Sequence, residues 1–175
     1  MDLGQRIMIM GGSGSGKSTI ARQIGELLNL PVVHMDTIWW QPGWVATPKE
    51  EAYARSMAAA DAPEWVFDGN MSKTRDYRLA RADTVIYLDF NRCICLWRVM
   101  KRRVMYHGKS RPDMTQGCNE KIDWEFLKFV WSYPKRSRGQ TIAWLNEIKP
   151  PKQVVQLKGR RAVKRFLQQL TEEAA

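Results

Sequence analysis

Cysteine and histidine are scarce in this sequence of 175 residues. The three cysteines are Cys93, Cys95 and Cys118, and the two histidines are His34 and His107. Cys93 and Cys95 lie too close together for the C-x-x-C spacing of zinc and redox sites, and two histidines cannot form a zinc site of several histidines. We therefore interpret the cysteines as buried free thiols.

Long hydrophobic runs are missing as well. A membrane-spanning helix needs about 18 apolar residues in succession, and no segment approaches that length. The apolar residues 7–10 are too few for the hydrophobic part of a signal peptide, and they lead directly into a glycine-rich motif. We therefore expect a cytoplasmic protein that does not contact a membrane.

Acidic residues number 18 against 28 lysines and arginines, and the imbalance lies in the C-terminal half. Residues 1–96 contain 10 basic and 11 acidic residues, whereas residues 97–138 contain 11 and four. Such a surface favours an anionic ligand, and either a polyphosphate or a nucleic acid would satisfy it. Because a domain averages about 150 residues, the length predicts a single domain over residues 1–175.

Short apolar runs typical of β-strands alternate with helical stretches. This pattern predicts a three-layer α/β fold, in which helices cover both faces of a parallel sheet. The five predicted strands are residues 6–10, 32–35, 65–67, 84–88 and 153–157. Helices are predicted over residues 20–28, 48–60, 92–105, 122–133, 141–148 and 162–170, with Thr47 and Asn91 as N-caps and a break at Pro134. Residues 106–121 show no sustained periodicity, which predicts a mobile loop.

A glycine- and serine-rich segment leads into Lys17 and Ser18 and matches the pattern G-x-x-x-x-G-K-S/T at every position. It follows a predicted strand and opens a predicted helix, as a phosphate-binding loop must. Its backbone N–H groups would surround an anion, to which the helix dipole adds about half a positive charge. We therefore predict ATP and Mg²⁺ as cofactors, with Lys17 as a catalytic residue and Ser18 as a metal ligand. The predicted cofactor-binding residues of this segment are Gly11, Gly12, Ser13, Gly14, Ser15, Gly16, Lys17, Ser18 and Thr19.

This loop alone does not identify an activity, because kinases, GTPases and ATPase motors share it. The guanine-reading N-K-x-D element is missing, and the chain is too short for a large motor or helicase. In the order of its elements the sequence resembles the adenylate kinase-like P-loop kinases. Four segments carry a narrower resemblance to the small group of DNA topology modulation proteins: residues 34–36 (His-Met-Asp), 39–44 (Trp-Trp-Gln-Pro-Gly-Trp), 65–70 (Trp-Val-Phe-Asp-Gly-Asn) and 111–114 (Arg-Pro-Asp-Met) with Gly117 and Cys118.

The resemblance implies a P-loop NTPase fold with the strand order 2-3-1-4-5, an acceptor-binding insert over about 37–64 and a lid over about 106–121. In this layout Asp68 lies beside the phosphate loop and, as in nucleoside monophosphate kinases, would orient Mg²⁺ through water; a simple Asp-Gly turn is the alternative. Asp36 stands where shikimate and gluconate kinases place a carboxylate facing the acceptor hydroxyl, and a turn or capping role is the alternative. His34 is either a further polar contact or a packed histidine.

The residues after Asp68 depart from the nucleoside monophosphate kinases, in which an arginine of this segment grips the acceptor phosphate. Asn70 follows here, and we predict that it binds the acceptor. Arg75 or Arg78 would replace the missing arginine, or would lie on a solvated helix face.

Arginines of the basic half are the predicted clamps on the transferred phosphoryl group, because planar guanidinium groups match its charged oxygens. Arg102 and Arg111 are predicted as catalytic, with Arg98 and Arg136 next. Arg98 and Arg102 lie four residues apart on one helix face and would repel each other unless an anion lay between them. Arg160, after the last strand, would stack on adenine, so we assign Arg98 and Arg160 to the cofactor. A solvated basic face is the alternative.

Tryptophan is abundant, with eight residues. Trp39, Trp40 and Trp44 fall in the predicted insert, where flat indoles would stack on an acceptor ring or form a small hydrophobic core. We predict an ATP-binding kinase that transfers the γ-phosphate to a small acceptor; its partners are the nucleotide and that acceptor. The alternative is a P-loop ATPase or nucleotide-binding protein that binds nucleic acid and influences DNA topology.

Overall fold

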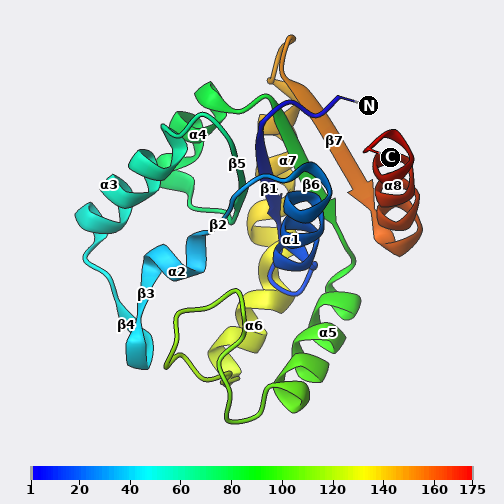
Figure 1. Cartoon of the computed structure of the whole chain (residues 1–175). Coiled ribbons are helices and arrows are strands. Elements are labelled where there is room, and N and C mark those ends of the chain that lie inside the picture. The colour runs from blue at the N-terminus through cyan, green and yellow to red at the C-terminus, as the bar shows by residue number, and fades with distance from the viewer. Residues whose placement is uncertain (1, 175) are drawn as a thin grey trace.

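The computed structural model describes residues 2–174 and has a five-stranded parallel sheet at its centre (Figure 1). The strands are β1 (Arg6–Gly11), β2 (Val32–His34), β5 (Trp65–Asp68), β6 (Thr84–Asp89) and β7 (Gln153–Lys158), and they lie in the order β2-β5-β1-β6-β7. Two further strands, β3 (Trp40–Gln41) and β4 (Val45–Ala46), form a separate antiparallel ribbon that the sequence did not predict. Without this ribbon the order is the predicted 2-3-1-4-5, and the α/β fold is confirmed.

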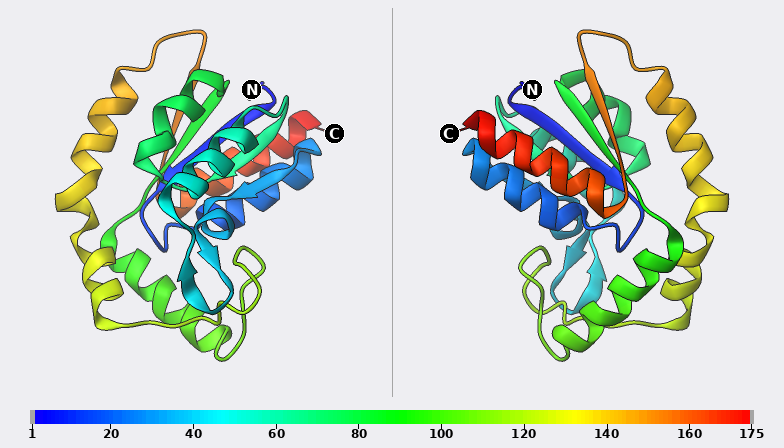
Figure 2. Two further views of the ribbon diagram at one scale, coloured as in Figure 1. Left: turned by 90° about the vertical axis from the view of Figure 1, so that its left-hand side faces the viewer. Right: turned by 90° about the vertical axis from the view of Figure 1, so that its right-hand side faces the viewer.

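Helices cover both faces of the sheet (Figure 2). Helices α1 (Lys17–Leu28) and α8 (Gly159–Ala174) pack on one face, where Ile24 and Phe166 join a buried apolar cluster with Ile9. Helices α3 (Lys49–Ala60), α4 (Arg75–Arg81) and α7 (Gly139–Asn146) cover the other face, over Met8 and Phe67. Because both faces are covered, the central strands β1 and β6 are apolar almost throughout rather than alternating.

Helix α5 (Arg92–Met105) has the predicted bounds. Its N-cap is also as predicted, because the side chain of Asn91 accepts a hydrogen bond from the backbone N–H of Cys93 at 2.8 Å. The predicted cap of α3 is wrong: the hydroxyl of Thr47 is buried and has no hydrogen-bond partner within residues 2–174. Two short helices, α2 (Met35–Trp39) and α4, had no predicted bounds.

Pro134 does not separate two helices, so this prediction is wrong. Helix α6 (Trp124–Tyr133) continues through a π-helical turn, Pro134–Arg138, into α7. A π turn holds more residues than an α turn and leaves room for a proline ring that lacks a backbone N–H. The result is one long curved helical unit on one side of the molecule (Figure 2).

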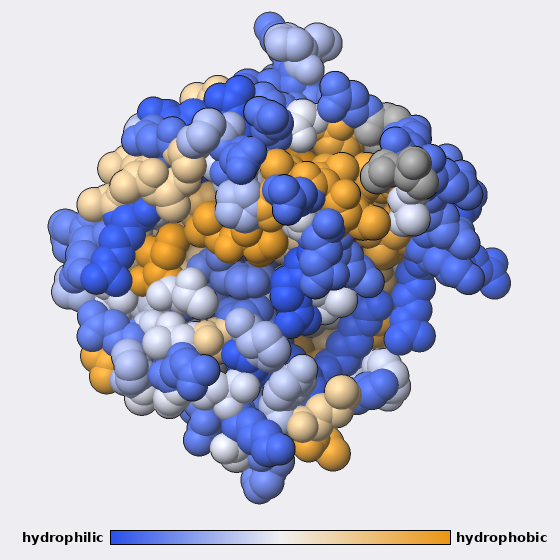
Figure 3. All heavy atoms as spheres, in the orientation of Figure 1, coloured by the Kyte–Doolittle hydropathy of each residue, from blue (hydrophilic) through white to orange (hydrophobic). Residues whose placement is uncertain are grey.

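The loop over residues 106–121 folds back on itself between α5 and α6, with bridges pairing His107 with Glu120 and Ser110 with Asn119. It lies beside the β3–β4 ribbon (Figure 2), and the backbone N–H of Gly43 donates to the carbonyl of Gly117 at 3.2 Å. Where this loop, α5 and the ribbon meet, the surface is predominantly hydrophilic (Figure 3). No helix within residues 2–174 is both long and apolar enough to cross a membrane.

Candidate active site at the carboxyl edge of the sheet

The glycine-rich loop connects β1 to α1. Gly14 and Gly16 adopt φ angles of +79° and +99°, and a Cβ on Gly14 would collide with the carbonyl oxygen of Cys95, so the turn requires glycine. No side chain caps the N-terminus of α1, and its first N–H groups are therefore available for phosphate oxygens. Residues 13–19 of the predicted set line one large cavity, and Lys17 lies over the loop with Nζ 3.1 Å from the carbonyl oxygen of Gly12.

The base of the loop is fixed from two sides by residues whose role the sequence did not show. The amide of Asn70 accepts a hydrogen bond from the N–H of Gly11 at 3.1 Å and donates one to the carbonyl of the same residue. On the other side the ring of Tyr133 packs so closely on Gly12 that a Cβ there would lie 3.1 Å from the ring. Both ends of the Asn70 amide bind the start of the loop, and because Asn70 also lines the cavity, its predicted acceptor contact stays a prediction beside this structural role.

Asp68 ends β5 next to the loop, and its Oδ2 lies 3.0 Å from Nδ1 of His34 in a hydrogen bond. Burial alone would raise the pKa of Asp68, but the bond with His34, the charge of Lys17 and the hydroxyl of Ser18 outweigh burial and lower it. Oδ1 of Asp68 is buried and has no hydrogen-bond partner in the described part of the chain. Such an oxygen near Ser18 fits Mg²⁺ or one of its waters. His34 is the partner of Asp68, and an acceptor contact is not needed to explain it.

Asp36, in the first turn of α2, faces the same cavity. By solvent accessibility Asp36 is an exposed residue, open to this cavity. Desolvation within this cavity raises the pKa of Asp36; the charges of Asp68 and Asp113 act in the same direction, against Lys17 and Arg111. Among residues 2–174 no side chain or backbone group hydrogen-bonds to this carboxylate, which leaves it available for a ligand hydroxyl.

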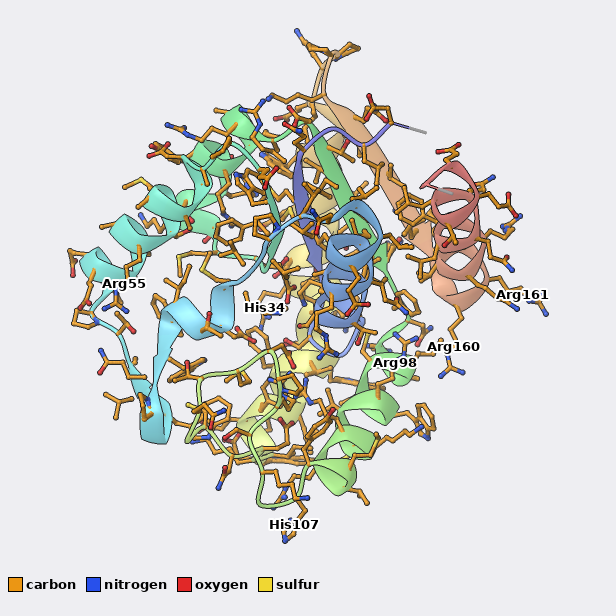
Figure 4. The ribbon with its side chains drawn as sticks, viewed as in Figure 1. His34, Arg55, Arg98, His107, Arg160 and Arg161 are labelled. Carbon is orange, nitrogen blue, oxygen red and sulfur yellow. The ribbon has the colours of Figure 1, made fainter. Side chains whose placement is uncertain are left out.

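The two arginines predicted to bind the cofactor are brought together. Nη1 of Arg98 donates to the carbonyl of Ser15 at 2.6 Å, and its guanidinium lies 4.5 Å above the ring of Phe90. Arg160 lies close by at the start of α8 (Figure 4), with its guanidinium 5.7 Å from the ring of Trp97. Burial and the charge of Arg160 lower the pKa of Arg98. Both arginines and both rings line the cavity, a suitable environment for a nucleobase beside phosphates.

Arg102 and Arg111 also line the cavity, but buried acidic residues hold them. Nε of Arg102 donates to Oε1 of Glu120 at 2.7 Å, and Nη1 of Arg111 donates to Asp113 at 2.6 Å. Neither acidic residue had a role predicted from the sequence: Asp113 belongs to the distinctive segment 111–114, and Glu120 to no recognisable pattern. Arg98 and Arg102 have different partners within the protein: Arg102 pairs with Glu120, and Arg98 contacts the carbonyl of Ser15.

Two of the three tryptophans of the insert reach the cavity. Trp40 and Trp44 line it, with ring centroids 5.4 Å apart in an edge-to-face arrangement. Trp44 also donates from Nε1 to the carbonyl of Asn119 at 2.9 Å and so joins the ribbon to the loop. Trp39 is not among the residues that line the cavity, so the structure gives its predicted acceptor role no support.

Arg78 does not replace the acceptor-binding arginine. It is fully buried and donates to the carbonyls of Gly69 and Met71 at 2.9 and 2.8 Å, which fixes the loop after Asp68. Burial, with the charge of Arg75, lowers the pKa of Arg78 to about 10. Arg75 is the one of the pair that lines the cavity.

The cavity has a volume of about 1230 Å³. Sites for one small ligand typically measure roughly 300–1,000 Å³, so a nucleotide and a second molecule fit here together. One wall comes from α6, the π turn and the start of α7, and of its residues the sequence pointed only to Arg136; they are Phe129, Tyr133, Arg136, Ser137, Gln140 and Thr141.

Comparison with known proteins supports the fold. No protein-family model matches the sequence, and no curated protein matches it. Among solved structures, a gluconokinase from Sinorhizobium meliloti 1021 is 16% identical with a TM-score of 0.52, over 99% of this chain and 97% of that one. An unliganded sugar kinase from Janibacter sp. HTCC2649 is 18% identical with a TM-score of 0.48, over 98% and 92%. The chain thus has the α/β fold that the gluconokinase also has, and the resemblance to DNA topology modulation proteins stays a prediction.

Proposed function

We propose that the protein is an ATP- and Mg²⁺-dependent kinase that phosphorylates a small acceptor. The observation that carries this proposal is the convergence of three features in one cavity. These are the glycine loop with its uncapped helix, Asp68 with an unpartnered buried oxygen, and Asp36 with a carboxylate that nothing else in the described chain binds. The fold likeness to a gluconokinase is consistent with it.

Ser18 and Asp68 are the residues of this chain that would hold Mg²⁺, Asp68 through water. Bound Mg²⁺ would neutralise charge on the β- and γ-phosphates. Within residues 2–174 no three or more His, Cys, Asp or Glu side chains form a metal-binding group. A site with so few protein ligands suits Mg²⁺, which keeps several waters and binds substrate phosphates.

The remaining steps belong to side chains of the cavity. The acceptor hydroxyl oxygen forms a bond to the γ-phosphorus as the bond to the β,γ-bridging oxygen breaks, and ADP leaves. Asp36 takes the proton of the hydroxyl, and its raised pKa makes it a stronger proton acceptor than an ordinary aspartate. Lys17, Arg102 and Arg111 stabilise charge on the phosphoryl oxygens during transfer. Trp40 and Trp44 offer a flat surface to the acceptor.

The test is an acceptor screen that measures ADP release with polyols, sugar acids, nucleosides and nucleoside monophosphates. Lys17→Ala is expected to lower acceptor-dependent turnover by about 100-fold or more, the usual cost of removing a group that stabilises transition-state charge. Lys149→Ala is the matched control, because Lys149 is exposed in the loop before β7 and away from the cavity. Equal ADP release by wild type and Lys17→Ala with every acceptor would show that the proposal is wrong.

A second candidate, nucleic-acid binding, has one observation in its favour. Four exposed aromatic side chains of α5 and α6 each have a lysine or arginine over the ring, the pairing that binds stacked bases and a phosphate backbone. They are Trp97 with Lys101, Trp124 with Lys128, Phe129 with Arg136 and Trp131 with Arg92. We place it second because this surface does not require the phosphate loop.

A further inference from the structure

One carboxylate joins the two arginines predicted to be catalytic. The side chain of Glu120 is only 2% exposed. Its Oε1 lies 2.7 Å from Nε of Arg102 and its Oε2 lies 2.7 Å from Nε of Arg111. Asp113 accepts a hydrogen bond from Nη1 of Arg111 and does not contact Arg102. Glu120 is therefore the link between an arginine of α5 and an arginine of the loop.

The positions of these contacts determine which atoms remain free. Glu120 accepts a hydrogen bond from Nε of Arg102 and forms an ion pair with Nε of Arg111, whose N–H makes no hydrogen bond within residues 2–174. In the same part of the chain both Nη atoms of Arg102 and Nη2 of Arg111 have no hydrogen-bond partner, and both side chains line the cavity. A guanidinium is planar, so the hydrogen bond at Nε of Arg102 limits rotation of that group, and the ion pair with Glu120 together with the hydrogen bond to Asp113 limits rotation of Arg111. The free Nη atoms are donors for a ligand with several charged oxygens.

The backbone of Glu120 is itself fixed. Its N–H donates to the carbonyl of Lys109 at 3.0 Å, and it pairs with His107 where the loop leaves α5. Glu120 thus stands at the closed neck of the loop, opposite Arg102. Burying a carboxylate here is costly even when it is paired, and an apolar side chain could close the neck as well or better. Orientation of the arginines is the effect that an apolar residue could not supply.

We propose that Glu120 is a positioning residue, which holds Arg102 and Arg111 so that their free Nη atoms bind the oxygens of the phosphoryl group during transfer. This inference rests on the proposed function. In this role Glu120, which is buried at the cavity wall, acts through the two arginines. It follows that its loss should affect the transition state far more than the binding of ADP.

The experiment compares the affinities of the full-length protein for Mg²⁺–ADP and for Mg²⁺–ADP with aluminium fluoride, which mimics the planar phosphoryl group. Glu120→Gln should weaken binding of the aluminium fluoride complex by about 10- to 100-fold, as for other residues that orient a reacting group. Its affinity for Mg²⁺–ADP should stay within about threefold of wild type. Once an acceptor is known, kcat should fall by the same factor with little change in KM for ATP.

Glu120→Asp keeps the negative charge but shortens the side chain by one methylene. It should therefore recover part of the affinity for the aluminium fluoride complex that Glu120→Gln loses. Glu26→Gln, the same change at an exposed position on α1, should behave as wild type in both measurements. Glu120→Gln could instead weaken binding of both complexes by the same factor, and Glu120→Asp then settles the role. If Glu120→Asp also weakens the affinity for both complexes equally, the role of Glu120 is purely structural and the inference is wrong.

Two further results are distinguishable. If wild type binds the aluminium fluoride complex more tightly than ADP and Glu120→Gln does so to the same degree, the inference is wrong while the proposed function stands. If wild type gains nothing from aluminium fluoride and releases no ADP with any acceptor, the proposed function fails and the role of Glu120 with it.

Discussion

Asp36, in the first turn of α2, and Asp68, at the end of β5, line the same cavity, yet their pKa values move in opposite directions. The charge of Lys17 lowers the pKa of both carboxyl groups. At Asp36 burial and the neighbouring carboxylate outweigh this effect and raise the pKa, whereas at Asp68 the hydrogen bond with His34 helps to offset burial, and the pKa is lowered. Pairs of acids whose environments separate their pKa values commonly divide their roles. Here the ionised Asp68 suits a metal, and Asp36 suits a proton acceptor.

This difference predicts a pH dependence of kinase turnover. Asp36 must be ionised to take a proton. Because its pKa is raised, kcat/KM should fall as the pH drops through a value above the ordinary aspartate pKa of about 4. Asp36→Asn should lower kcat by about 100-fold or more and abolish this acidic limb. The measurement is a pH–rate profile of both forms with the acceptor found by screening. An unchanged acidic limb in Asp36→Asn would assign the titration to another group.

For single residues, the sequence could predict a role only where adjacent residues form a recognisable motif. Residues 11–19 form a contiguous pattern, so the sequence could locate the glycine loop between β1 and α1, of which residues 13–19 line the cavity. The roles of Asn70 and Glu120 were not, because their partners Gly11 and Arg102 are 59 and 18 residues away. Only the folded chain brings these pairs together.

Among the elements, the strands and helix α5 were predictable from the sequence, and irregular connections were not. The apolar runs of β1 and β6 and the Asn91 cap of α5 follow local rules, and their bounds agree with prediction to within a residue. The π turn at Pro134 and the β3–β4 ribbon depend on tertiary packing. The ribbon is held by the loop: the hydroxyl of Thr115 donates to the carbonyl of Trp40, and the thiol of Cys118 to that of Gln41.

The ribbon supplies a matched pair of tryptophans for a test of acceptor binding. Trp40 lines the cavity and its neighbour Trp39 does not. Trp40→Ala should raise KM for the acceptor by about tenfold, since stacking on an aromatic ring contributes on the order of 1–3 kcal/mol. Trp39→Ala should leave KM within about twofold. Steady-state kinetics at saturating ATP measure both, and equal effects of the two substitutions would contradict an acceptor site at the ribbon.

For the whole molecule, the charge of +10 is less available to a polyanion than its size suggests. Arg102, Arg111 and Arg138 are paired with buried or partly buried carboxylates, and Arg98 points into the cavity. The remaining free cations include those over the exposed rings of α5 and α6. Of these cations, Lys101 and Arg136 also line the cavity, whereas Arg92 and Lys128 do not. The salt dependence of polyanion binding and the effect of Lys17 on turnover nevertheless allow the two candidate functions to be separated by experiment.

The last prediction concerns that separation. A single-stranded oligonucleotide should bind only at low salt, because contacts of exposed cations with phosphates weaken steeply as salt displaces them, by a slope of about 0.7 per phosphate on logarithmic axes. Lys17→Ala should bind it as wild type does, and the oligonucleotide should not stimulate ADP release. Fluorescence anisotropy across a salt series measures the first two, and the ADP assay the third. Tight binding near physiological salt together with stimulated ADP release would favour the nucleic-acid function, because only then would the exposed basic surface be coupled to the phosphate loop.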